Sequence, residues 1–108
     1  MNFNVGNLYQ IKKYFWYLYP SKDGADEALR SGRIPHSTDT EASASRSIVY
    51  WSKELKCNVT YIAPNSIFCL IEQDGEYLKV LSTNGELGWM IYSEDEAWTK
   101  GTIEEIKQ

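Results

Sequence analysis

The chain has 108 residues, of which 43% are hydrophobic and 14% are aromatic, and its formal net charge is −4. A chain of this length and apolar content is typical of one domain with one modest core, which excludes disorder of the whole chain. The acidic balance argues against binding of a phosphate backbone, because such binding depends on clustered Lys and Arg. Residues 48–108 are the most acidic part, with five basic and ten acidic side chains.

The two cysteines, Cys57 and Cys69, are too few for a disulfide framework and lack Cys-x-x-Cys spacing. We expect both to be reduced, buried strand residues. The first six residues lack the basic and apolar regions of a signal peptide, and no apolar run approaches the ~20 residues of a membrane span. These features predict a cytoplasmic protein without a membrane segment, a metal or a cofactor.

Two strands are expected near the N-terminus. Residues 5–11 alternate loosely and predict a short strand, and residues 14–19 are dense in aromatic strand formers. On a strand, one face would carry Tyr14, Trp16 and Leu18 and the other would carry Phe15, Tyr17 and Tyr19. Either both faces are covered, or one aromatic face is a binding platform.

Residues 20–56 form a long polar connection that we interpret as an insertion into the domain, and such connections are usually functional or mobile. Within it, residues 23–32 predict one or two helical turns, with Asp23 as N-cap and Gly32 just beyond the end. Residues 33–38 are expected to be loop.

Residues 39–56 fit two structures. Ala44, Ile48, Trp51 and Leu55 recur every three or four positions, as on one face of a helix that begins after Asp39 or Thr40. The run from Ile48 to Trp51, by contrast, has the β-branched and aromatic character of a strand. We favour the helix and leave the strand as the alternative.

The C-terminal half predicts strands at residues 57–62, 67–72, 77–82 and 87–92. Gly75 and Gly85 follow Asp74 and Asn84, and these pairs predict two tight hairpins. We expect the inward residues of this meander to be Phe68, Leu70, Leu78 and Val80. Residues 94–98 predict an acidic turn anchored by Trp98, and residues 101–107 fit a closing strand or one helical turn.

The order Asp74-Gly75-Glu76-Tyr77-Leu78-Lys79-Val80, then Asn84-Gly85, then Gly88-Trp89-Met90 resembles the bacterial Src-homology-3 domain over roughly residues 57–92. This resemblance implies a mainly β fold, a small antiparallel Src-homology-3-like barrel of five to six strands. Residues 1–108 would form this single domain, with a long loop insertion at about 20–56 that carries one or two short helices. Gly88 would then allow a close approach of two strands.

The resemblance also implies candidate ligand-binding residues. Tyr77 matches the exposed tryptophan of proline-peptide-binding relatives, and Tyr19 falls near their first-strand tyrosine. The groove candidates are Tyr17, Tyr19, Tyr77 and Tyr92, with Asp23, Asp26 and Glu27 in place of the loop acids. The chain departs from the pattern after Met90, because Ile91-Tyr92 stands where the groove needs Pro-Ser-Asn-Tyr. A polyproline ligand is therefore weakly implied.

A second resemblance involves short runs near the N-terminus and the run Ser-Thr-Asn-Gly-Glu-Leu-Gly-Trp, which resemble small proteins of tailed phages that infect cyanobacteria. Membership of that group would imply a location in the host cytoplasm. It brings no known activity with it.

The leading hypothesis is a non-catalytic protein-interaction or assembly module, with a protein or peptide partner or a homo-oligomer. One alternative is a nucleic-acid-binding barrel, whose basic residues would be Lys12, Lys13, Lys22, Arg30, Arg33 and Arg46. The least supported alternative is a small enzyme in which His36 activates Cys57 or Cys69.

Overall fold

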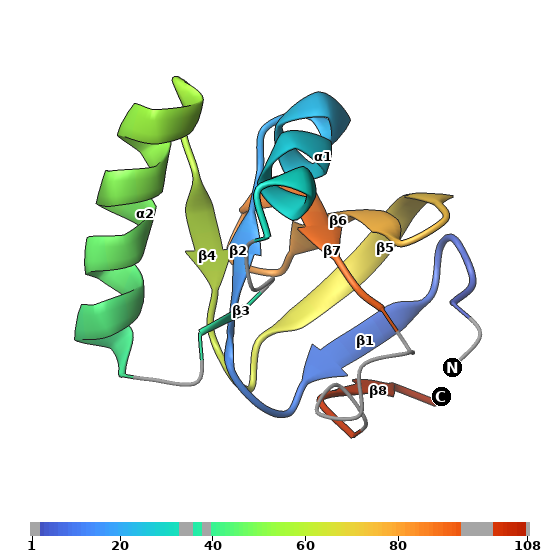
Figure 1. Ribbon diagram of the computed structural model, residues 1–108. Helices are drawn as coiled ribbons and strands as arrows, with labels where there is room; N and C mark the ends of the chain where they lie inside the picture. Colours follow the sequence, from blue (N-terminus) through green and yellow to red (C-terminus); the bar gives the residue numbers. More distant parts are fainter. Residues whose placement is uncertain (1–2, 33–35, 38–39, 94–100, 108) are drawn as a thin grey trace.

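The computed structural model describes residues 3–32, 36–37, 40–93 and 101–107, with the backbone alone at residues 36–37. The fold is mainly β, with antiparallel sheets and two helices (Figure 1). In chain order the elements are β1 (Leu8–Ile11), β2 (Phe15–Leu18), α1 (Lys22–Arg30), β3 (His36–Ser37), α2 (Glu41–Leu55), β4 (Thr60–Ile62), β5 (Ile67–Asp74), β6 (Tyr77–Ser82), β7 (Leu87–Ile91) and β8 (Ile103–Glu105).

The strands form a five-stranded sheet in the order β7-β6-β5-β1-β8 and a three-stranded sheet in the order β3-β2-β4. The segments β1–β2 and β4–β5 each pass from one sheet to the other, and they pair with each other in both sheets. Their bends include Tyr14 and Asn65, whose φ angles are 74° and 72°. An isolated bridge between Tyr19 and Trp89 also connects the sheets. The strands do not close into a barrel.

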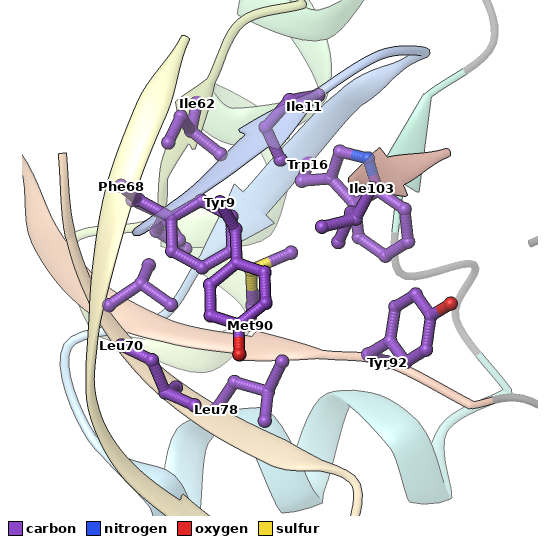
Figure 2. Packing of buried hydrophobic residues seen from close by; sticks show 12 residues of the cluster. Tyr9, Ile11, Trp16, Ile62, Phe68, Leu70, Leu78, Met90, Tyr92 and Ile103 are labelled. Atoms are coloured by element: carbon purple, nitrogen blue, oxygen red, sulfur yellow. The ribbon is translucent and has the colours of Figure 1, made fainter. Parts of the chain in front are cut away.

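The main core lies between the two sheets, and Figure 2 shows its side chains converging from β1, β2, β5, β6 and β7. Phe68, Leu70, Leu78 and Val80 are all buried, as the alternation along β5 and β6 predicts. Tyr9 stacks on Phe68 with ring centroids 5.6 Å apart. The predicted inward face of the meander is therefore confirmed.

The helices cover a second apolar cluster on the outer side of β2 and β7, which includes Tyr17, Tyr19, Trp89 and Ile91. The predicted helix at residues 39–56 is confirmed as α2, and the Thr40 hydroxyl caps it by accepting from the Ser43 amide at 3.3 Å. The prediction of Asp23 as the cap of α1 is wrong. Ser21 holds that position because its extended backbone lets its hydroxyl accept from the Gly24 amide, at 3.1 Å.

Three further differences follow from where the elements end. β3 lies in the segment expected to be loop and pairs with Phe15 and Trp16 of β2. Cys57 is not in a strand, because α2 continues to Leu55 and the next strand begins only at Thr60. The tail forms β8, a strand rather than a helical turn. The predicted turn at residues 94–98 lies outside the described residues.

Candidate binding surface

The aromatic residues expected to line a groove are mostly buried. The exposed fractions of Tyr17, Tyr19 and Tyr92 are 6%, 1% and 8%. Tyr92 stacks on Trp16 in the main core, with ring centroids 5.9 Å apart, while Tyr17 and Tyr19 pack in the cluster under the helices. These three rings offer little surface to a ligand, and their proposed binding role stays a prediction.

Tyr77 and Asp26 are the two candidates that the structure brings together. The Tyr77 hydroxyl donates to Asp26 Oδ1 at 2.6 Å, and Arg30 Nε lies 2.9 Å from Asp26 Oδ2. Burial, the hydrogen bond to Asp26 and the negative charge of that carboxylate raise the pKa of Tyr77 to about 12. Asp23 and Glu27 are exposed on α1. The Tyr77–Asp26 hydrogen bond therefore fastens α1 to β6, whereas the Asp26–Arg30 ion pair lies within α1.

The residues proposed for an enzyme are not assembled by what the structure describes. Cys57 follows α2, Cys69 lies in β5, and neither takes part in a disulfide. The side chain of His36 lies outside the described part of the chain. Within that part, no group of three or more His, Cys, Asp and Glu side chains is arranged to hold a metal ion.

Acids accompany several of the basic residues proposed for nucleic-acid binding. Lys12 Nζ lies 3.7 Å from Glu104 Oε2, and Lys22 forms an ion pair with Asp74. Arg30 pairs with Asp26, as described above. Arg33 lies outside the described residues. These neighbours offset the positive charge that a phosphate backbone would need.

The outer face of α2 is the surface that the sequence patterns did not single out. Arg46, Val49, Tyr50 and Lys53 follow the spacing i, i+3, i+4, i+7, so they lie in one line along the helix. Val49 is 59% exposed and Tyr50 is 56% exposed. We call these four residues the α2 stripe. The opposite face of the helix packs on the protein through Ala44, Ile48, Trp51 and Leu55.

The α2 stripe is held in place and carries charge at both ends. The Tyr50 ring packs edge-on against Trp51, with centroids 4.6 Å apart and an interplanar angle of 75°. Neither Arg46 nor Lys53 takes part in any of the ion pairs found between described residues. The stripe therefore presents two apolar side chains between two cations.

A second exposed apolar group lies on the hairpin of β5 and β6. Ile71 is 40% exposed and Leu81 is 39% exposed. Leu81 pairs with Cys69, and Ile71 is the extra residue where the register shifts between Leu70 and Glu72. Two exposed acids lie toward the tip of the hairpin: Glu72, which pairs across the strands with Lys79, and Glu76, which lies in the turn. We call Ile71, Glu72, Glu76 and Leu81 the hairpin patch.

The sequence contained a signal for the α2 stripe. The same periodicity that predicts the inner face of the helix also places residues 46, 49, 50 and 53 on the outer face. Apolar residues on both faces of one helix indicate a helix that needs more than one neighbour. The hairpin patch had a weaker signal, the apolar residues on both sides of β5.

The structure defines a small, mainly β domain of antiparallel sheets with two helices. Its described residues contain no helix with the length and apolar character needed to span a membrane. Searches against protein families, curated proteins and solved structures found no match for this chain.

Proposed function

We propose that this protein is a non-catalytic interaction module that binds a protein partner through the α2 stripe. The observation that carries the proposal is the exposure of Val49 and Tyr50, 59% and 56%, side by side on one helix face. Grouped, exposed apolar side chains mark interaction sites, and Tyr and Arg are enriched where binding energy concentrates. Arg46 adds such a residue at one end of the stripe.

The chemistry of the stripe specifies the kind of partner. Arg46 and Lys53 lie about 10 Å apart along the helix axis, given the rise of 1.5 Å per residue. A partner that covers Val49 and Tyr50 must bring acidic groups near both cations, because complementary charges steer association and select the partner. We therefore assign the stripe to a protein surface with an apolar centre and an acidic rim.

We also propose that the fold is an open relative of the Src-homology-3-like barrel. Support comes from the paired bends of β1–β2 and β4–β5, from the Tyr19–Trp89 bridge, and from Gly88. In this fold α1 packs against Tyr77, Trp89 and Ile91, where the aromatic groove of proline-peptide binders would be expected. This cover favours α2 over the aromatic groove as the binding element.

A capture experiment tests the proposed function. The full-length chain is immobilised and exposed to a lysate of the native host, and the proteins retained by wild type and Val49→Glu are compared by quantitative mass spectrometry. We expect Val49→Glu to lose the proteins that wild type retains. Leu87→Glu is the matched control, because Leu87 is 56% exposed but lies on β7, and it should retain them.

Equal capture by wild type and Val49→Glu would remove the α2 stripe as the binding surface. A fluorescent single-stranded DNA at low salt tests the other class of ligand, since electrostatic binding is strongest there. DNA binding that disappears in Arg46→Ala would assign the stripe to nucleic acid instead and overturn the proposal. Thermal melts of each variant establish that it is folded.

A further inference from the structure

We infer that the partner of the α2 stripe is a second copy of this chain, which presents its hairpin patch. This inference rests on the proposed function, because it names the occupant of the same stripe. It follows from three properties of the two surfaces: their chemistry, their positions in the molecule, and the poor fit of each surface to itself.

The chemistry of the two surfaces is complementary. The α2 stripe sets Val49 and Tyr50 between two cations, whereas the hairpin patch has Glu72 next to Ile71 and Glu76 in the turn. Residues 72–79 carry three acids and one lysine, Lys79, which lies across the strands from Glu72, so this part of the hairpin is net acidic. Lys22 pairs with Asp74, so Glu72 and Glu76 are the acids without an ion pair to another described residue. The hairpin patch thus supplies the apolar centre and acidic rim that the stripe requires.

The two surfaces lie at opposite sides of the molecule. Figure 1 shows α2 at one side, next to β4, and the turn between β5 and β6 at the other. The molecule measures 40 × 29 × 27 Å, so one copy cannot bring its own hairpin patch onto its own α2 stripe. Both surfaces of one copy are therefore available to two neighbours at once. A contact between unlike surfaces adds copies head to tail.

Neither surface matches a second copy of itself. Antiparallel pairing of two α2 helices about the midpoint of Val49 and Tyr50 would set Arg46 opposite Lys53 of the second copy. Two hairpin patches would bring together two copies of residues 72–79, each with three acids and one lysine. Repulsion between like charges disfavours both arrangements. The unlike pairing avoids this repulsion.

The interface should be weak and sensitive to salt. Four side chains on each copy form a contact smaller than the standard interface of about 800 Å² per partner. The charges at its rim are exposed, and a Debye length of about 8 Å at physiological ionic strength screens them. We therefore expect the average mass to rise gradually with concentration and to fall when salt is added.

Sedimentation analysis of wild type and two variants tests this inference. Val49→Glu disables the stripe and Ile71→Lys disables the hairpin patch, while each variant keeps the other surface intact. The average mass of wild type should rise further above the monomer mass as the concentration increases from about 10 μM to about 1 mM, a range that covers weak interfaces. Each variant alone should stay monomeric. An equimolar mixture should form a species of twice the monomer mass and nothing larger, because one intact stripe meets one intact patch.

Controls separate loss of the interface from loss of the fold. Lys13→Glu should associate like wild type, since it places a carboxylate in the bend between β1 and β2, outside both surfaces. Glu76→Lys, at an exposed turn position, is a second hairpin variant and should weaken association several-fold without touching the apolar core. Thermal melts establish that all variants are folded.

Monomeric wild type over the whole concentration range would overturn the inference, as would a mixture of the two variants that remains monomeric. If wild type is monomeric but Val49→Glu still abolishes capture of a host protein, the proposed function stands and only the second copy is excluded. If wild type is monomeric and Val49→Glu captures the same proteins as wild type, both proposals are overturned.

Discussion

Gly88 illustrates how a single residue links the two sheets. A Cβ atom at this position would lie 2.9 Å from Leu18 Cβ and 3.1 Å from the Tyr19 carbonyl oxygen. Real Cβ atoms essentially never approach other atoms within 3.0 Å, so a side chain here would push β7 away from the end of β2. The sequence suggested this role through the glycine that precedes Trp89, and the structure identifies the atoms that enforce it.

Gly88→Ala should lower the free energy of unfolding by about 1–3 kcal/mol, the usual range for overpacking. Gly24→Ala, in α1, is the contrasting variant, because its new Cβ would lie no closer than 3.4 Å to Ser21 Oγ and 3.8 Å to Cys57 and Tyr19. It should raise stability by about 0.5–1 kcal/mol through helix propensity. Urea unfolding of both variants measures these effects. Equal effects from the two substitutions would contradict the close-approach argument.

Tyr77 gives a pH-dependent prediction. Burial and the hydrogen bond to Asp26 raise its pKa to about 12 from a usual value of 10.0. A raised phenol pKa adds stability that is present below the unfolded value and is lost as pH rises through the folded value. The free energy of unfolding should therefore fall between about pH 10 and pH 12, and the fall should be smaller in Tyr77→Phe.

Absorbance titration of the tyrosines tests the cause. Asp26→Asn removes the negative charge beside the phenol and should bring the Tyr77 titration back toward its usual range. Arg30→Gln, on the other oxygen of Asp26, is the comparison variant and should leave the hydroxyl–carboxylate contact in place. An unchanged Tyr77 titration in Asp26→Asn would show that Asp26 does not favour the neutral phenol.

At the scale of elements, α2 ends with a residue in an unfavourable conformation. Lys56 adopts the left-handed region with φ of 55° and donates its amide to the Ser52 carbonyl. Only glycine adopts this conformation without cost, and the penalty for other residues is about 1–2 kcal/mol. The helix therefore ends where the chain must turn toward β4, although the residue there is poorly suited to the turn.

Lys56→Gly should raise the free energy of unfolding by up to about 1 kcal/mol, since it relieves the left-handed backbone. Lys53→Gly, in the last turn of α2, should lower the free energy of unfolding by about 1 kcal/mol because glycine is a poor helix former. Both substitutions remove one positive charge, so their difference isolates the backbone effect. Thermal denaturation followed by circular dichroism measures both. A loss of stability in Lys56→Gly would be the opposite of the expected result.

Elements with a long repeating sequence pattern were predictable, and elements of a few residues were not. α2 was predictable because four apolar residues repeat over several turns and Thr40 stands at the start. β3 was not, because its two residues form a strand only by pairing with Phe15 and Trp16 across the sheet. The α2 stripe was partly predictable. Its spacing can be read from the sequence, but its exposure depends on which face of α2 packs against the rest of the protein.

At the scale of the whole molecule, the Tyr19–Trp89 bridge connects the two sheets. The Tyr19 amide donates to the Trp89 carbonyl at 2.9 Å and the Trp89 amide donates to the Tyr19 carbonyl at 2.7 Å. Both residues are also largely buried, at 1% and 8% exposed. If the sheets unfold as one unit, these two amides should exchange only by global unfolding.

Native-state hydrogen exchange tests this expectation. The opening free energies of the Tyr19 and Trp89 amides should equal the free energy of global unfolding. The exposed turn at Gly85 should open at far lower cost and serves as the local reference. Exchange at Tyr19 and Trp89 with the low cost of a loop would mean that the two sheets separate before either unfolds.

The sequence by itself determined the mainly β class, the meander of β5 to β7, its buried face and the two helices. These features depend on local patterns, because alternation, helical spacing and turn residues act over a few neighbouring positions. Only the tertiary structure decided that the sheets stay open, that Tyr17, Tyr19 and Tyr92 are buried, and that one face of α2 remains exposed. Those outcomes depend on which element packs on which, and distant segments of the chain determine that choice together.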